Sequence, residues 1–375
     1  MGRLSFQVTG ESHGPELNLV LTGLPAGLEI PRERIDHWLS LRRQLAGRGP
    51  RAARESDLWT VTTGVSGDHT NGGPLHISIA NKDRSGESVD RQGAKANLEF
   101  PRPGHADLAG ALKWGLDDAT AVAELASARI TAAYTVLGAI CQEILAGAGC
   151  HSLAHVTRVG TVIDRRRNWR KGVRLSRLVE QLEASSLLFL DGKREQEARK
   201  LLTEVDLAGD TVGGAFEIVV APVPPGLGGP QPLGARLDSR LAATVMGIPG
   251  VRAVAIGDAF GADRLLGSRF HSPLHYSAGK GYFHQRNTAG GVEGGMSNGE
   301  PIVLRAVVKP LASLGKPLAS ASLRDGRAGT APAVRSDVCA AAPAAIVARA
   351  LVAFVLADVL LDRGQGDGFE PICHR

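Results

Sequence analysis

The sequence predicts an α+β protein in which two related halves each supply an antiparallel sheet, with helices filling the space between the sheets. The prediction depends first on an internal repeat. Residues 10–28, GESHGPELNLVLTGLPAGL, align without gaps with residues 209–227, GDTVGGAFEIVVAPVPPGL, at a constant offset of 199 positions. Glycine, valine, proline and leucine recur at six of these positions, so we interpret the repeat as a duplication rather than chance.

Two further pairs of segments follow in the same order. Residues 70–77, TNGGPLHI, and 297–304, SNGEPIVL, each combine an Asn-Gly turn with an alternating strand. RPGHADL leads into the apolar run 119–145, and RSDVCAAAP leads into the apolar run 344–361, each of helical length. The order loop, strand, turn, strand, motif and helix therefore occurs twice.

The two halves are expected to face each other about a pseudo-twofold axis, because each sheet must bury its apolar face against the helices. No Pro/Gly-rich tract is long enough to form a linker between the repeats, so the two halves are expected to share one core. We therefore expect one domain over residues 1–375, with duplicated halves at approximately 1–150 and 200–365.

Composition limits the kind of ligand that the chain binds. It has 375 residues, 43% of them hydrophobic, which is enough to bury a large core. Its formal net charge is +5, and many arginines lie beside glycine-rich polar motifs, which favours a small, multiply anionic ligand. Aromatic residues make up only 4% of the chain, too few to stack on bases, so we expect no nucleic-acid partner.

The cysteines and the apolar runs indicate the cellular compartment in which the protein is expected. The cysteines lack the paired spacing of a zinc site, no secretory signal precedes the first motif, and no run reaches the roughly 20 apolar residues of a membrane span. We therefore expect a cytoplasmic protein with free thiols, no metal site and no membrane partner. The cysteines are Cys141, Cys150, Cys339 and Cys373.

Two histidines stand in motifs that suit proton transfer. His13, in GESHG, follows Ser12, and the repeat keeps the surrounding glycines but has Val212 in its place, so the turn itself does not need an imidazole. His105, in FPRPGHADL, lies on backbone stiffened by two prolines and flanked by an arginine and an aspartate. The alternatives are a local hydrogen bond for His13 and an exposed turn position for His105.

Hydroxyls and arginines elsewhere complete a candidate anion site. Ser127 and Arg129 fall at the expected start of a helix, where a hydroxyl, backbone amides and a guanidinium can meet an anionic group, and Asp337 precedes the apolar helix of the second half. The alternatives are a solvated arginine and an N-cap acid. Together these residues predict a site for a ligand carrying phosphate and carboxylate. No dinucleotide fingerprint or Walker A loop is present, which disfavours hydride chemistry on a dinucleotide fold.

On these motifs the chain resembles the chorismate synthase family, whose signatures match GESHG, RPGHADL, SAR followed by Thr131, GDTVGG, AGGVEGGMSNGEPI and RSDVCAAAPAAIV. The match is collinear from about residue 10 to residue 367. The resemblance implies the family's β-α-β sandwich, a homotetramer, reduced FMN as cofactor and 5-enolpyruvylshikimate 3-phosphate as substrate, and it leaves NADPH open as the reductant. The implied reaction removes phosphate from C3 and a proton from C6 by 1,4-anti elimination, in the shikimate pathway.

The resemblance also assigns roles to matching residues. His13 would protonate the departing phosphate, and His105 would protonate the reduced flavin. Asp337, helped by Ser12 and Ser127, would take the proton from flavin N5. The matched substrate-binding arginines are Arg43, Arg48, Arg102, Arg129 and Arg335. The matched flavin positions are Ala126, Ser127, Pro249, Gly250, Gly294, Lys309, Pro310, Leu311, Ala312, Ser313 and Arg335.

The chain departs from the family mainly at expected flavin contacts and on helix surfaces. Leu125 stands where the family has an arginine, and losing a charged contact there would lower FMN affinity by about one to two powers of ten. Two alternatives therefore stay open: a paralogue acting on a related cyclohexene ester or phosphate, and a non-catalytic anion-binding relative that has lost flavin. The other departures are Ile130, Tyr134, Pro249, Gly250, Ser272, Pro273 and Arg349.

Overall fold

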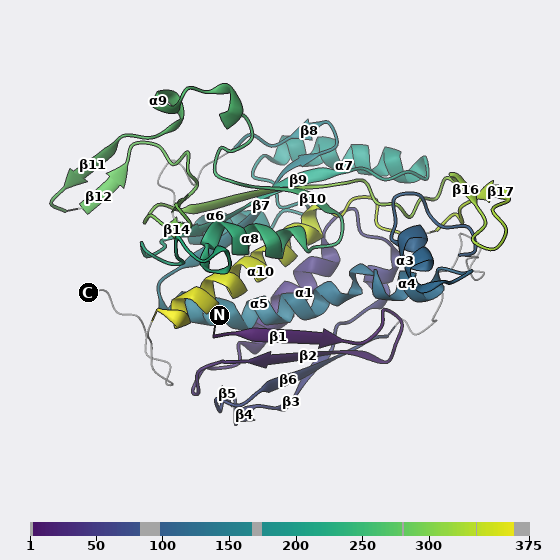
Figure 1. The fold of residues 1–375 in the computed structure, drawn as a ribbon, viewed down its shortest axis with the longest axis horizontal. Coiled ribbons are helices and arrows are strands. Elements are labelled where there is room, and N and C mark those ends of the chain that lie inside the picture. Colours follow the sequence, from purple (N-terminus) through teal and green to yellow (C-terminus); the bar gives the residue numbers. More distant parts are fainter. Residues whose placement is uncertain (1–2, 83–97, 167–174, 280, 335, 364–375) are drawn as a thin grey trace.

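Two antiparallel sheets enclose a layer of helices in the computed structural model of the chain (Figure 1). The sheets lie at the bottom and the top of the view, and the helices α1 (Arg32–Gln44), α5 (Thr131–Gly147) and α10 (Ala341–Asp362) lie between them. This arrangement confirms the predicted α+β sandwich. The residues that the structure describes are 3–82, 98–166, 175–279, 281–334 and 336–363.

The first sheet is built from strands that alternate buried and more exposed side chains. Its order is β1-β2-β6-β3, and all neighbours are antiparallel. In β2, Leu17, Leu19 and Leu21 are buried, because successive side chains of a strand face opposite sides of the sheet. The pairing register sets Leu19 opposite Ile77, which joins two buried side chains on the core face. The strands are β1 Ser5–Thr9, β2 Glu16–Thr22, β6 Leu75–Ala80 and β3 Trp59–Thr63.

The second sheet repeats this order and adds an edge strand. Its order is β10-β15-β9-β7-β8, again antiparallel throughout, so β7, β9, β15 and β10 follow one another as β1, β2, β6 and β3 do. The strands are β10 Val251–Ile256, β15 Ile302–Val308, β9 Gly214–Ala221, β7 His151–Val159 and β8 Val162–Ile163.

The segments matched in the sequence occupy matching places in the two sheets. The repeat aligns β2 with β9, and the Asn-Gly turns lead into β6 and β15. Even a side-chain contact recurs: Thr70 Oγ1 donates to the carbonyl of Pro25 at 2.6 Å, and Ser297 Oγ donates to the carbonyl of Pro224 at 2.6 Å. The same hydroxyl therefore closes the same turn in both halves.

The helical layer is held together by close contact between α5 and α10. A Cβ placed on Gly138 would lie 2.2 Å from Ala350 Cα, so only glycine lets the two backbones approach this closely. By length and composition, the segment 120–147 and α10 could each cross a membrane, but 72% and 94% of their most apolar windows are buried inside the fold. They are core helices of the sandwich.

The remaining elements cover the sheets and connect the strands. Figure 1 shows the β11 and β12 hairpin extending away from the body of the molecule. These elements are α2 Pro50–Arg54, β4 Val65–Ser66, β5 His69–Thr70, α3 Asp107–Trp114, α4 Thr120–Leu125, η1 Ala128–Ile130, α6 Leu175–Glu183, α7 Gly192–Leu207, η3 Leu233–Ala235, α8 Leu237–Met246, η4 Ala262–Arg264, α9 Gly267–Phe270, β11 Leu274–Ser277, β12 Gly281–His284, β13 Val292–Glu293, β14 Met296–Ser297, β16 Ala319–Ala321 and β17 Ala328–Thr330.

One charged cluster is buried within the second sheet. His155 lies between Glu217, 3.0 Å from its Nδ1, and Asp164, 3.2 Å from its Nε2, and all three side chains are buried. Burial alone would lower the pKa of His155, but the hydrogen bonds and negative charges of the two carboxylates outweigh it and raise that pKa. The contact between His155 and Glu217 ties β7 to β9.

The thiols agree with the expected reduced state. Cys141, Cys150 and Cys339 are free and buried. Burial raises the pKa of the Cys150 and Cys339 thiols to about 11, which makes them poor nucleophiles. Cys373 lies outside the described residues.

Candidate active site

The loop that carries GESHG meets the segment after α4. Ser12 Oγ donates to Ser127 Oγ at 2.8 Å, and His13 Nδ1 lies 2.6 Å from Glu124 Oε1. The backbone N–H of His13 donates to the other oxygen of Glu124 at 2.9 Å. Two segments more than a hundred residues apart in the chain therefore bring together three of the residues expected in the site.

A single asparagine fixes the shape of this loop. Asn81 follows β6, and its Nδ2 donates to the carbonyls of Gly14 at 2.8 Å and Glu11 at 3.2 Å. Its Oδ1 accepts from Arg129 Nε at 2.6 Å. Gly10 has a φ of +112°, and a Cβ there would lie 2.4 Å from the carbonyl oxygen of Glu16, which explains the glycine before the polar triplet.

The second histidine is also paired with a carboxylate. His105 Nδ1 lies 2.5 Å from Asp107 Oδ1, and Arg102 donates to both oxygens of Asp107, at 2.7 Å from Nε and 2.9 Å from the terminal nitrogen. Burial alone would raise the pKa of Asp107, but the hydrogen bonds from His105 and Arg102 hold it well below its usual range. A terminal nitrogen of Arg102 also lies 3.0 Å from Nδ1 of His105, so the arginine and the carboxylate together hold the imidazole ring in place.

Asp57 lies at the centre of a cluster of arginines, which we call the arginine cluster and which includes Arg42, Arg43 and Arg129. Its side chain is fully buried, and it receives a hydrogen bond from Arg42 at 3.0 Å, another from Arg129 and an ion pair with Arg43 at 3.5 Å. Burial alone would raise the pKa of Asp57, but the two buried guanidinium groups lower it. Burial also lowers the pKa of Arg42, to about 10, which still leaves it charged at neutral pH.

Glu55 and Arg51 connect this cluster to the GESHG loop. Arg51 donates to Ser12 Oγ at 2.7 Å and pairs with Glu55 at 3.4 Å. Glu55 also lies 3.6 Å from Arg129, and its backbone carbonyl accepts from Arg43 at 2.6 Å. The arginines of this cluster are therefore held in place by buried acids rather than left free on the surface.

Asp337 links the two halves of the chain at this site. It accepts from the guanidinium of Arg48 and, at 2.6 Å, from the backbone N–H of Gly49. A Cβ on Gly49 would lie 2.7 Å from the backbone of Ser336, so the close approach needs glycine. Arg335, which was expected in both the substrate and the flavin sets, lies outside the described residues.

Most of the segment expected to contact flavin lies beside the His105 loop. Ser313 Oγ accepts from Arg102 at 2.9 Å, and the Lys309 ammonium group donates to the carbonyl of Gly104. The backbone N–H of Lys309 donates to the carbonyl of Gly250 at 2.9 Å, which places the expected Pro249 and Gly250 pair next to the same segment. Since Ser336 Oγ also donates to the carbonyl of Ser313 at 2.6 Å, a chain of contacts runs from His105 to the neighbour of Asp337.

Gly294 lies elsewhere in this chain. It falls between β13 and β14, beside the Ile302 end of β15, whereas Lys309 follows the Val308 end. The strand between these ends is about 20 Å long at 3.3 Å per residue. Among the described residues, no backbone hydrogen bond joins Gly294 to the other expected flavin residues, and its place in the site stays a prediction.

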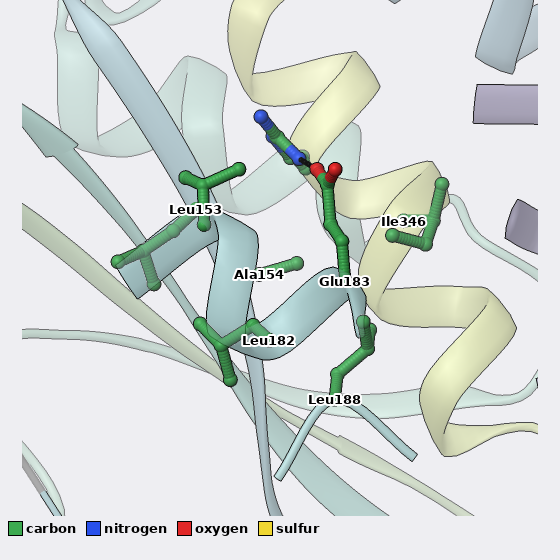
Figure 2. A pocket seen from close by; sticks show the side chains of 8 residues that line it. Leu153, Ala154, Leu182, Glu183, Leu188 and Ile346 are labelled. Atoms are coloured by element: carbon green, nitrogen blue, oxygen red, sulfur yellow. Dashed lines mark hydrogen bonds and ion pairs between the residues drawn. The ribbon is translucent and has the colours of Figure 1, made fainter. Parts of the chain in front are cut away.

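The departures from the family pattern have different surroundings. Leu125, at the end of α4, is 60% exposed. Arg349 is buried, pairs with Glu183 at 2.6 Å, and places its guanidinium 4.5 Å from the ring centre of Trp38. Figure 2 shows this ion pair at the edge of a small pocket between β7, α6 and α10, lined mostly by leucine, alanine and isoleucine. This pocket belongs to the core and shares no residue with the candidate site.

Several residues of the site were missed at the level of sequence. Asn81 had a signal in the sequence, because it is a polar residue shortly after the segment 70–77, which was expected to contain a strand. Asp57 precedes β3, a strand that was not predicted from the sequence. Arg51 and Glu124 had no such signal, since their partners come from distant segments. Among the described residues, the cluster contains five guanidinium groups and three carboxylates: Arg42, Arg43, Arg48, Arg51 and Arg129 with Glu55, Asp57 and Asp337.

The fold and this site define a class of protein: a two-sheet sandwich that combines two imidazoles, each against a carboxylate, with a cluster of arginines held by buried acids. Comparison with known proteins agrees. The family model described as chorismate synthase matches residues 4–361. The chain is 38% identical to the chorismate synthase of Caldicellulosiruptor saccharolyticus, over 98% of this chain and 97% of that protein.

Other relatives give the same result. The identity is 40% with the chorismate synthase of Moorella thermoacetica, over 99% of this chain and 97% of that protein. A crystal structure of chorismate synthase superposes with a TM-score of 0.77 at 31% identity, covering 97% of this chain and 93% of that one. The chain belongs to the chorismate synthase family, whose members are lyases of the shikimate pathway.

Proposed function

We propose that the protein catalyses the 1,4-anti elimination of phosphate from 5-enolpyruvylshikimate 3-phosphate to give chorismate. The observation that carries the proposal is the pair of imidazoles, His13 and His105, each with Nδ1 against a carboxylate beside the arginine cluster. This arrangement leaves Nε2 of both rings for proton exchange with a ligand. Membership of the family over nearly the whole chain supports the same activity.

The arginine cluster suits this substrate by charge. The substrate carries one phosphate and two carboxylates, and the cluster has more guanidinium groups than acids. Among the described residues, the buried Nε atoms of Arg42, Arg43 and Arg48 have no hydrogen-bond partner, so donor capacity remains for an anion. Because Asp57 already holds the guanidinium groups in place, little reorganisation is needed when the substrate binds.

Reduced FMN is the cofactor in this proposal, and the segment around Lys309 fits it. The Lys309 ammonium group donates to the carbonyl of Gly104, and the Lys309 backbone N–H donates to the carbonyl of Gly250. These two glycines have φ of +79° and +89° and carry no side chain, so a flat anionic ligand can approach the backbone closely. Lys309 to Ser313, with Ser127, would hold the flavin. When bound, it supplies the electron density that lets phosphate leave and the non-acidic C6 proton be lost.

The side chains of this chain bind the substrate and move protons. His13 donates a proton from Nε2 to the departing phosphate, whose charge the arginines also meet. His105 holds a proton at Nε2 on the flavin side of the site, oriented by Asp107. Asp337 accepts the proton released in the reaction, and the hydrogen-bonded hydroxyls of Ser12 and Ser127 assist it.

A second candidate is favoured by one observation. Leu125 is apolar and 60% exposed where the family has an arginine, which suits a paralogue with altered flavin binding that acts on a related cyclohexene ester or phosphate. For either candidate we propose a cytoplasmic homotetramer, with NADPH as a reductant of the flavin. Loss of reduced-FMN binding would instead point to a non-catalytic anion-binding relative.

The test is an anaerobic assay with chemically reduced FMN and 5-enolpyruvylshikimate 3-phosphate, in which phosphate release and chorismate absorbance are followed together. Equal amounts of both products are expected, and His13→Ala should reduce the rate by orders of magnitude while the fold is kept. If reduced FMN binds but neither product forms, the proposed substrate is wrong and related allylic phosphates should be tried.

A further inference from the structure

The side chain of Glu124 uses both of its oxygens on His13. Oε1 lies 2.6 Å from Nδ1, and Oε2 accepts from the backbone N–H of the same histidine at 2.9 Å. The side chains are only 13% and 15% exposed, so water competes little for these contacts. The contact joins the end of α4 to a loop 111 positions earlier in the chain.

This geometry decides which ring nitrogen carries the proton. An ionised carboxylate can only accept hydrogen bonds, so Nδ1 must donate whether the ring is neutral or charged. Nε2 is then the atom that gains and loses a proton, and it has no hydrogen-bond partner among the described residues. His105 also has Nδ1 against a carboxylate, at 2.5 Å from Asp107, but there a donor nitrogen of Arg102 lies 3.0 Å from the same Nδ1.

We propose that Glu124 is a positioning residue that keeps the proton of His13 on Nδ1, so that the neutral ring is the Nδ1–H tautomer and the charged ring donates its second proton from Nε2 to the phosphate of the substrate. The proposal rests on the proposed function for the identity of the ligand, but not for the tautomer of the ring. The arrangement corresponds to the carboxylate and imidazole of serine proteases, where replacing the acid by its amide gives the wrong tautomer and reduces kcat by about 10⁴-fold.

Glu124→Gln separates this role from a simple structural one. The amide oxygen of glutamine can still accept the backbone N–H of His13, so the loop keeps its anchor. Its NH₂ group would then face Nδ1, which must become an acceptor, and the ring would change to the Nε2–H tautomer. Glu11→Gln is the matched control, because it removes the same charge from an exposed position of the same loop.

The first readout is the ¹⁵N NMR spectrum of the full-length protein labelled at histidine, recorded at a pH at which the rings are neutral. The signals of His13 are assigned as those missing from the spectrum of His13→Ala. We expect the Nδ1–H tautomer in the wild type and in Glu11→Gln, and the Nε2–H tautomer in Glu124→Gln. An Nε2–H tautomer in the wild type, or an unchanged tautomer in Glu124→Gln, would overturn the proposal.

The second readout is turnover of 5-enolpyruvylshikimate 3-phosphate with reduced FMN. We expect Glu124→Gln to reduce kcat at least about tenfold with KM changed less than about threefold, and Glu124→Asp, which keeps the charge, to recover part of the rate. A kcat equal to that of Glu11→Gln would also overturn the proposal. If the wild type releases no phosphate, the proposed function fails, while the tautomer measurement still decides the role of Glu124.

Discussion

Replacing Asp57 by asparagine removes the charge at the centre of the arginine cluster while leaving the shape of the side chain almost unchanged. Asp57 has a φ of +51°, and asparagine adopts this left-handed conformation as readily as aspartate, so the backbone is not strained. The variant therefore isolates the charge. Arg42 and Arg129, both buried, would keep their positive charges without the carboxylate that now pairs with them.

The magnitude follows from this burial. Breaking a buried ion pair by removing one partner costs about 3–5 kcal/mol, because the other charge stays desolvated. We expect Asp57→Asn to lower the free energy of unfolding by about this amount at pH 7. Since the pKa of Asp57 is lowered in the folded protein, its contribution is present above its ordinary value of 3.8 and is lost as the pH falls below it.

The assay is urea unfolding at several pH values, with Asp68→Asn as the matched control. Asp68 pairs with Arg32 at 3.3 Å, but the two side chains are 68% and 56% exposed, and an exposed pair contributes only about 0–1 kcal/mol. We expect a large shift of the midpoint for Asp57→Asn, a small one for the control, and a difference that shrinks towards pH 3. Equal shifts for the two variants at pH 7 would refute the reasoning.

Three further predictions follow from the structure. Leu125→Arg should tighten FMN binding about ten- to a hundredfold, measured by fluorescence titration, and an unchanged Kd would mean that this position does not face the cofactor. Gly138→Ala should lower the free energy of unfolding by about 1–3 kcal/mol, because its Cβ would lie 2.2 Å from Ala350 Cα. Gly192→Ala, where a Cβ meets open space on a helix, should not lower it. Equal midpoints of urea unfolding for the two variants would contradict this. His155→Gln should destabilise the protein most below about pH 6.5, because a raised pKa gives stability that is lost as the pH rises through the folded value; a destabilisation that grows towards alkaline pH would contradict this.

The arrangement of strands was largely predictable from the sequence. The alternation in Leu17, Leu19 and Leu21 and the Asn-Gly turns are local patterns, and local patterns specify strands and hairpins without reference to the rest of the chain. The constant offset of the repeat then identifies β2 and β9 as equivalent strands of the two halves. The predicted α+β sandwich and the family resemblance are both confirmed, whereas the single domain, the cofactor and the roles of individual residues stay predictions.

The candidate site was predictable only in part. Ser12, His13 and Ser127 stand in recognisable motifs, and the structure brings them together. The partner that orients His13, however, is Glu124, which looks like an ordinary helix residue in the sequence. Residues at distant chain positions become partners only through packing, so no local pattern identifies them.

The sequence by itself determined the strand and turn pattern, the duplicated order of segments and the residue types available for acid–base chemistry. Only the tertiary structure decided which carboxylate faces which imidazole, that Asp57 holds the arginines, and that Arg349 belongs to the core. The physical reason is that secondary structure follows from periodicity along the chain. The charge and hydrogen-bond partners of a site depend instead on distances between segments, which only the packed core sets.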